Sequence, residues 1–218
     1  MSLLYKALSS SKSLVFTIMA GTLYHVVLGA AQFEVIWAVE DKGFNPNTFG
    51  QINGWIFVVF GVLGSLFGGI ASDWTLRKYN LPRTWFLLIL TLLFMPLAFT
   101  RYLDTDSILF WVGICSSAFS LGCFYGPVFA VIQELVPPTI KGTVVAFNLL
   151  CLNMLGIALG SILFGILADY AVTQGYENPY TNLLVGFSCV FLVFGPILYY
   201  LAGRFYEQDK KALIEKFN

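Results

Sequence analysis

The chain has 218 residues, of which 58% are hydrophobic and only 11% are charged, and its mean hydropathy is +0.78. A soluble domain carries about a quarter charged residues, so this composition excludes a water-soluble globular protein. The formal net charge is zero, which gives no reason to expect a nucleic-acid partner.

Six apolar segments are each about long enough to cross the hydrocarbon core of a bilayer. They cover residues 14–39, 49–72, 84–100, 107–133, 143–168 and 181–202. Asn45-Pro46 and Asn178-Pro179 are turn and helix-start signals between segments. The first segment is too long for the apolar region of a cleaved signal peptide. The expected fold class is an all-α membrane protein with six transmembrane helices and short loops.

Lysine and arginine are distributed unevenly between the loops. Ten lie on one side of the predicted membrane, namely Lys6, Lys12, Arg77, Lys78, Arg83, Lys141, Arg204, Lys210, Lys211 and Lys216. The other side has Lys42 and Arg101. Because positive residues accumulate on the cytoplasmic side, we expect a multi-pass protein of the inner or plasma membrane with both termini in the cytoplasm.

Residues 64–73 (GSLFGGIASD) and 160–169 (GSILFGILAD) are identical at five of ten positions, including Asp73 and Asp169. One stretch ends the second segment and the other ends the fifth, so the chain crosses the membrane three times between the two ends. Since three is odd, the second copy has inverted topology, a pattern typical of transporters. This predicts two inverted three-helix repeats, residues 1–106 and residues 107–218, the second with a short cytoplasmic tail. Chance similarity between glycine-rich membrane helices is the alternative.

The second segment leads into a candidate family motif. Gly69-x-x-x-Asp73, followed by Arg77 and Lys78, resembles the cytoplasmic loop motif G-x-L-a-D-R-x-G-R-[RK] of the major facilitator superfamily. The motif's first arginine and second glycine are replaced here by Trp74 and Leu76. Such a degenerate version is typical of the second half of these transporters.

A second stretch strengthens the resemblance. The run from Gly126-Pro127 through Pro137-Pro138 to Lys141 is similar to the tenth helix and following loop of that superfamily, most of all in its spinster-like branch. Its members have twelve helices in two six-helix halves, so these helices resemble the seventh to twelfth. A second six-helix bundle is then expected as a partner, because the chain is an incomplete copy, dimerises, or meets a separate polypeptide.

The resemblance implies a membrane transporter, or half of one, that moves a small organic solute by alternating access, with proton or ion coupling left open. The spinster-like similarity favours an amphipathic or lipid-like solute. A non-transporting six-helix interaction or regulatory protein is the alternative function. The resemblance also implies a gate formed by Gly69, Asp73, Arg77 and Lys78, in which the two cations neutralise the carboxylate. The alternative for these four residues is a solvated loop that only fixes topology.

Polar side chains at membrane depth are the second group of candidates, because they are costly unless they face protein or water. His25 and Gln32 are seven residues apart and are expected on one helical face, with Glu34 pointing the other way. His25, the single histidine, either couples transport to protons or is a neutral ring bonded to a backbone carbonyl or to a neighbouring helix. The family resemblance favours these residues as lining the solute or proton pathway: His25, Gln32, Asn53, Tyr125 and Asn148.

Several chemistries are not expected. The sequence has no phosphate-binding loop, no nucleophile-elbow motif and no paired histidines. Its four cysteines all lie within apolar stretches, where they are read as small helix residues. We therefore expect neither an enzyme nor a bound cofactor or metal.

Overall fold

The computed structural model describes the backbone of residues 2–217 and the side chains of residues 3–213. Within this part of the chain, six helical spans are long and apolar enough to cross a membrane. They are Lys12–Glu40, Pro46–Tyr79, Arg83–Tyr102, Ile108–Leu135, Pro138–Thr173 and Pro179–Leu213. The predicted all-α fold class with six spans is confirmed, and a short helix, α1 (Ser2–Ser10), precedes the first span.

Three of the spans are divided into shorter elements. The first consists of α2 (Lys12–Ala30), the 3-10 turn η1 (Ala31–Phe33) and α3 (Glu34–Glu40). The third consists of α5 (Arg83–Ala98) and the 3-10 turn η2 (Phe99–Tyr102). The fifth consists of η3 (Pro138–Ile140), α7 (Lys141–Leu150), the π-helix η4 (Cys151–Ala158) and α8 (Leu159–Thr173). The other spans are α4 (Pro46–Tyr79), α6 (Ile108–Leu135) and α9 (Pro179–Phe217).

Helix α4 begins and ends at identifiable signals. The Asn45 side chain accepts hydrogen bonds from the backbone N–H groups of Asn47 and Thr48, at 3.0 and 3.2 Å, which caps the helix before Pro46. The helix ends at Asn80, which has the left-handed conformation (φ 49°) common at helix C-termini. This is farther along the chain than predicted.

The predicted cytoplasmic loop motif is therefore not a loop. Asp73, Arg77 and Lys78 lie in the last two turns of α4. The sequence from Ile70 to Tyr79 contains neither glycine nor proline, so nothing breaks the helix there.

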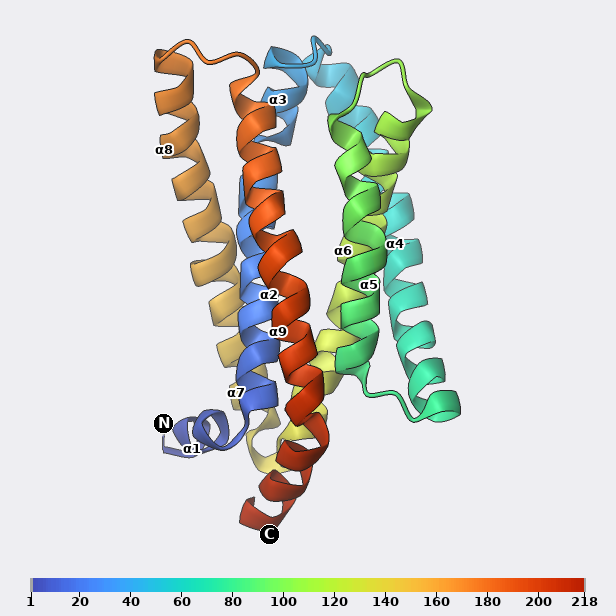
Figure 1. The fold of residues 1–218 in the computed structure, drawn as a ribbon, viewed down its shortest axis with the longest axis vertical. Helices are drawn as coiled ribbons and strands as arrows, with labels where there is room; N and C mark the ends of the chain where they lie inside the picture. The colour runs from blue at the N-terminus through green and yellow to red at the C-terminus, as the bar shows by residue number, and fades with distance from the viewer. Residues whose placement is uncertain (1, 218) are drawn as a thin grey trace.

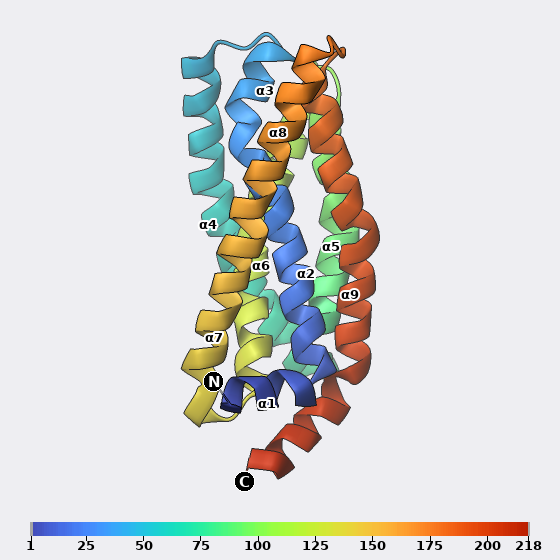
Figure 2. The same ribbon diagram turned by 90° about the vertical axis from the view of Figure 1, so that its left-hand side faces the viewer.

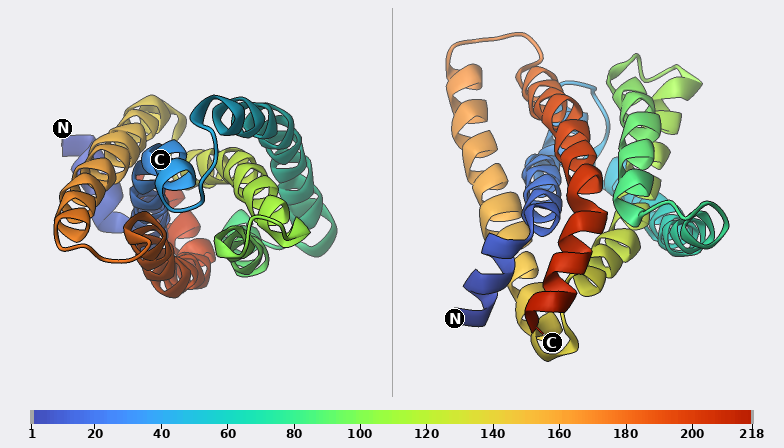
Figure 3. Two further views of the ribbon diagram at one scale, coloured as in Figure 1. Left: turned by 90° about the horizontal axis from the view of Figure 1, so that it is seen from above. Right: turned by 60° about the horizontal axis from the view of Figure 1, so that its bottom comes forward.

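Both termini lie at the same end of the bundle, which we call the termini end; the opposite end is the far end (Figure 1). Helix α1 lies across the bundle at the termini end (Figure 2). Seen from above, α8 and α4 form opposite edges of the bundle (Figure 3). Helix α4 packs on α6, and the η4–α8 segment packs on α2. Each edge helix thus packs on the first helix of the other three-helix unit.

Close backbone contact holds α4 against α6. The Cβ of an alanine at Gly64 would overlap the backbone oxygen of Phe119, and one at Gly122 would overlap the backbone oxygen of Gly61 and approach the backbone nitrogen of Ser65. Only glycine permits this approach, a common device between membrane helices.

The same arrangement holds the η4–α8 segment against α2. A Cβ at Gly160 would overlap the backbone oxygen of Val26, and a Cβ at Gly29 would overlap the oxygen of Ile157 and approach the nitrogen of Ser161. Three residues of α4 have a counterpart 96 residues later in η4 or α8, namely Gly61 with Ile157, Gly64 with Gly160 and Ser65 with Ser161. Two residues of α2 have a counterpart 93 residues later in α6, namely Val26 with Phe119 and Gly29 with Gly122. The two interfaces are thus equivalent atom for atom, as an inverted repeat requires, although the 106/107 boundary itself stays a prediction.

Replacing Gly64 by alanine is expected to destabilise the protein by about 1–3 kcal/mol, because the new methyl group overpacks a backbone contact. Gly54 lies on the same helix with no atom within 4 Å of where a Cβ would be. Gly54→Ala should therefore be neutral or stabilising by up to about 1 kcal/mol, the difference in helix propensity. Unfolding of both variants in mixed detergent micelles measures the difference; equal stabilities would contradict the close contact.

Candidate functional site

A network of charged and polar side chains connects four helices at the termini end. Arg83, the first residue of α5, binds Asp73 of α4 through Nη2 at 2.7 Å and Glu134 of α6 through Nη1. The hydroxyl of Tyr206 on α9 donates to the same Glu134 carboxylate. Arg83 is 11% exposed, Glu134 25% and Asp73 46%. This termini-end network fixes the relative positions of α4, α5, α6 and α9.

The other predicted gate residues lie near this network but outside it. Arg77 is exposed, and the Lys78 amine lies over the rings of Trp74 and Tyr79 at 4.8 and 5.4 Å. Gly69 is half-buried, with open space where a Cβ would be. In the part of the chain that the structure describes, Asp73 has Arg83 as its ion-pair partner rather than the two expected cations.

Sequence reasoning missed Arg83, Glu134 and Tyr206. A signal was present for two of them: Arg83 and Glu134 are charged residues directly bordering predicted apolar segments. Their mutual contact depends on how α5 and α6 pack, which the sequence pattern does not specify.

At the far end, a second ion pair is more deeply buried. Glu34, the first residue of α3, pairs with Arg101 in η2, and their side chains are 6% and 9% exposed. The Asn53 amide on α4 donates to Glu34 Oε2 at 3.0 Å. The Arg101 guanidinium lies over the rings of Trp37 and Tyr102, at 5.1 and 5.7 Å. Such contacts attract a cation to an aromatic face, so Arg101 is held from several sides.

This pair corrects two predictions about the first span. Gln32 does not share the environment of His25: His25 is buried and Gln32 is exposed. Glu34, expected to point away, is buried among protein groups. The reason is the packing of neighbouring elements, because Arg101 of η2 and Asn53 of α4 contact Glu34, whereas Gln32 lies on an exposed part of η1.

The middle of the bundle holds His25 and Tyr125 together. His25 Nδ1 lies 2.8 Å from the Gly21 backbone oxygen, to which it donates, and Nε2 lies 3.1 Å from the Tyr125 hydroxyl. With the proton on Nδ1, Nε2 accepts from Tyr125. This geometry fits the neutral, backbone-bonded histidine, one of the two interpretations open from sequence.

Asn148 is fully buried in α7. Neither its Nδ2 nor its Oδ1 has a hydrogen-bond partner among the described residues. The structure thus joins His25 with Tyr125 and Asn53 with Glu34, while Gln32 and Asn148 make no hydrogen bond to the other candidates.

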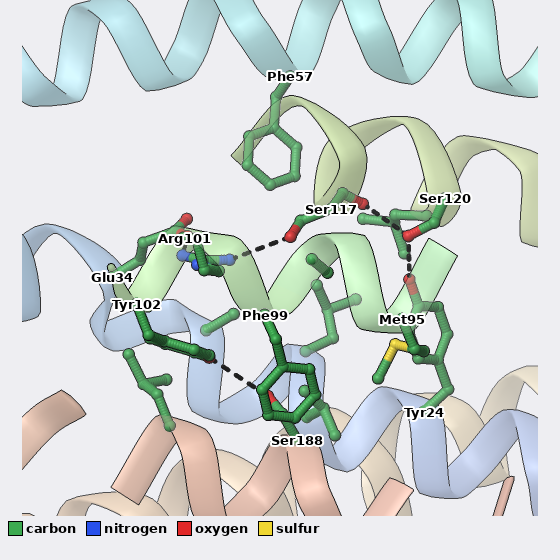
Figure 4. Close-up of a pocket in the computed structure, with 16 residues that line it drawn as sticks. Tyr24, Glu34, Phe57, Met95, Phe99, Arg101, Tyr102, Ser117, Ser120 and Ser188 are labelled. Atoms are coloured by element: carbon green, nitrogen blue, oxygen red, sulfur yellow. Dashed lines mark hydrogen bonds and ion pairs between the residues drawn. The ribbon is translucent and has the colours of Figure 1, made fainter. Parts of the chain in front are cut away.

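A cavity of about 70 Å³ lies beside the far-end ion pair (Figure 4). Glu34 and Arg101 form part of its wall, and five hydroxyl-bearing residues line it, namely Tyr24, Tyr102, Ser117, Ser120 and Ser188. Most of the remaining lining is apolar. The volume accommodates a few atoms, since one water occupies about 30 Å³ of the liquid, so this is a site for a small group.

The comparisons with known proteins agree with this architecture. The family model of the Major Facilitator Superfamily matches residues 2–161, and the chain belongs to this superfamily. No match is found among curated protein sequences.

Two solved structures of a bacterial homolog to the human lysosomal transporter Spinster are similar in fold. The inward-facing, occupied structure has a TM-score of 0.75 at 17% identity and covers 91% of this chain and 50% of that chain. The inward-facing, unoccupied structure has a TM-score of 0.67 at 14% identity and covers 99% of this chain and 51% of that chain. The chain spans about half the length of these structures, so its fold is half of a major facilitator fold.

Proposed function

We propose that this chain is one half of a secondary transporter that moves a small organic solute by alternating access against a second six-helix bundle. The observation that carries this proposal is the membership of the superfamily together with a length of half the matched structures. The second bundle is either an N-terminal half or a second copy of this chain.

An exposed polar residue in a spanning segment supports the need for a partner. Gln32 is exposed within the first span. A polar side chain at membrane depth is costly unless it faces protein or a water-filled cavity. Helix α4 is the least buried of the six spans, and Gly50 and Gly54 near its start have open space at the Cβ position. A second bundle packed on these exposed surfaces would shield Gln32 and α4 from lipid.

In this proposal, the termini-end network belongs to the gate. Asp73 is nearly half exposed, so its carboxylate has room for a partner beyond Arg83. Arg77 and Lys78 lie within two turns of it on the same helix and offer cations to the second bundle. The distribution of lysine and arginine supports a cytoplasmic location for the termini end.

The test is cysteine accessibility, which needs no knowledge of the solute. In a background without the four native cysteines, Gln32→Cys reports the far end and Gly69→Cys reports the termini end. A membrane-impermeant maleimide is applied to the reconstituted protein with and without Arg83→Gln. Alternating access predicts that Arg83→Gln raises labelling at residue 69 and lowers it at residue 32.

Val193→Cys, on an exposed apolar part of α9, serves as the control and should remain unlabelled throughout. If labelling at residues 32 and 69 changes in the same direction or not at all, the two ends are not reciprocally coupled. The alternating-access proposal would then be wrong.

A further inference from the structure

The far-end ion pair is not required by the fold or the gate proposed above. A buried pair of charges gains little net stability, because desolvation offsets the attraction, whereas leaving one partner unpaired is costly. Ionisable groups inside membrane spans therefore indicate function. Glu34 and Arg101 both lie within spans and are more than nine-tenths buried.

Arg101 has more donors than its neighbours use. Its Nη2 binds Glu34, whereas Nη1 reaches the Ser117 hydroxyl only at 3.4 Å, longer than a normal hydrogen bond. Its buried Nε has no hydrogen-bond partner in the described structure. By contrast, Glu34 is bound by both Arg101 and Asn53. Arg101 thus has unfilled donor capacity, which suits an acceptor, and an acceptor beside a guanidinium is favoured if it is an anion. The Asn53 Oδ1 also has no partner among the described residues, but Asn53 is not part of the cavity lining.

The cavity supplies the space for such an acceptor. Arg101 forms part of its wall, and the hydroxyls of Ser117 and Ser120 face it from α6 (Figure 4). Ser117 donates to the Gly113 backbone oxygen and Ser120 to that of Ser117, so each hydroxyl has to rotate before it can donate to an anion. The volume of about 70 Å³ has room for a halide or a single carboxylate group.

The other groups around the pair determine how it responds to protons. Tyr24 faces the cavity from α2, Asn53 binds the carboxylate from α4, and Tyr102 stacks on the guanidinium from η2. Ser117 and Ser120 face it from α6 and Ser188 from α9. Among the described cavity-lining residues, Glu34 is the carboxylate and Arg101 the cation. Lys42 is at the same end, where its amine donates to the backbone oxygens of Tyr102 and Leu103.

We propose that this cavity binds a proton and a small monovalent anion together, the proton on Glu34 and the anion on Arg101. A proton taken up from the bulk solution adds to a carboxylate oxygen of Glu34, which breaks the ion pair. Arg101 remains protonated, and its freed N–H donors bind the anion. Either event alone would leave one uncompensated charge, whereas the two together leave the net charge of the site unchanged. Trp37 and Tyr102 hold the guanidinium in position in both states.

Binding of each species should therefore strengthen binding of the other, as linkage requires. This inference does not depend on transport; if the proposed transport occurs, the anion is the solute's carboxylate or a co-transported halide. The anion affinity should rise about tenfold for each unit by which pH is lowered, the slope for one linked proton.

The test is proton uptake by the purified chain in detergent, in weakly buffered sodium gluconate with a pH-sensitive dye. Sodium chloride or sodium acetate is added, and the bound anion is measured in parallel by calorimetry. We expect proton uptake that saturates with the bound anion. A response to chloride alone identifies a halide site, and a response to acetate alone identifies a carboxylate site; both support the proposal. Absence of uptake with both anions in the unmodified chain would overturn it, whatever the transport experiments show.

Three variants sharpen the result. Glu34→Gln should still bind the anion, but with no proton uptake and no dependence on pH. Arg101→Gln should lose both anion binding and proton uptake. Asp104→Asn removes an exposed carboxylate at the same end and should behave as the unmodified chain. If anion binding by Glu34→Gln still depends on pH, this would also contradict the assignment of the proton to Glu34.

Discussion

Arg101→Gln is expected to lower the free energy of unfolding by about 3–5 kcal/mol, the cost of leaving a buried charge without its partner. Glu34 would keep only the neutral amide of Asn53. Glu34→Gln should have a cost of the same kind, because Arg101 is always protonated. The measurement is unfolding by denaturing detergent, followed by tryptophan fluorescence, in a buffer with gluconate as the anion.

The double variant Glu34→Gln/Arg101→Gln provides the internal control. It contains no buried charge at this position, so it should be more stable than either single variant. If the effects of the two single substitutions simply add, the side chains do not interact and the far-end ion pair is not formed. Adding chloride should restore stability to Glu34→Gln specifically, if the anion replaces the lost carboxylate.

Arg83→Gln is the second large effect expected. It removes the cation that lies between Asp73 and Glu134, so two carboxylates face each other across α4 and α6 without a counter-charge. We expect a loss of about 2–4 kcal/mol, less than for a fully buried pair because Asp73 is nearly half exposed. The melting temperature of the purified protein reports this loss.

Arg77→Gln is the matched control for Arg83→Gln. Arg77 is an arginine at the same end, six residues earlier and exposed on α4. Its replacement should change the free energy of unfolding by less than about 0.5 kcal/mol, as is usual for surface positions. Equal losses for the two variants would mean that the termini-end network adds no specific stability.

The two ends of the bundle show how far sequence reasoning reaches. The repeat was detectable because Gly64 and Gly160 make the same kind of close helix contact, which requires glycine at both positions. The spans were found because apolar length is a local property of the sequence. By contrast, the partner of Asp73 is set by the packing of α4 on α5, and Arg83 was counted only as a loop charge.

The first span shows a different limit. No proline or glycine marks the 3-10 turn at Ala31–Phe33, so the helical period was extended through it without warning. The burial of Glu34 also depends on Arg101 and Asn53, which lie on other helical elements. His25 and Tyr125 were both recognised as polar residues at depth, but their contact joins positions 100 residues apart, and only the folded bundle reveals it.

The exchanged packing of the two repeats has a consequence for biosynthesis. The first span packs on η4, α8 and α9, which the ribosome makes last. When that span enters the bilayer, the partners of its His25 and Glu34 side chains, Tyr125 and Arg101, are not yet made. Until the later spans emerge, these two side chains lack their partners and are costly at membrane depth. The order of synthesis thus makes the first span the one whose insertion is least favourable until the bundle is complete.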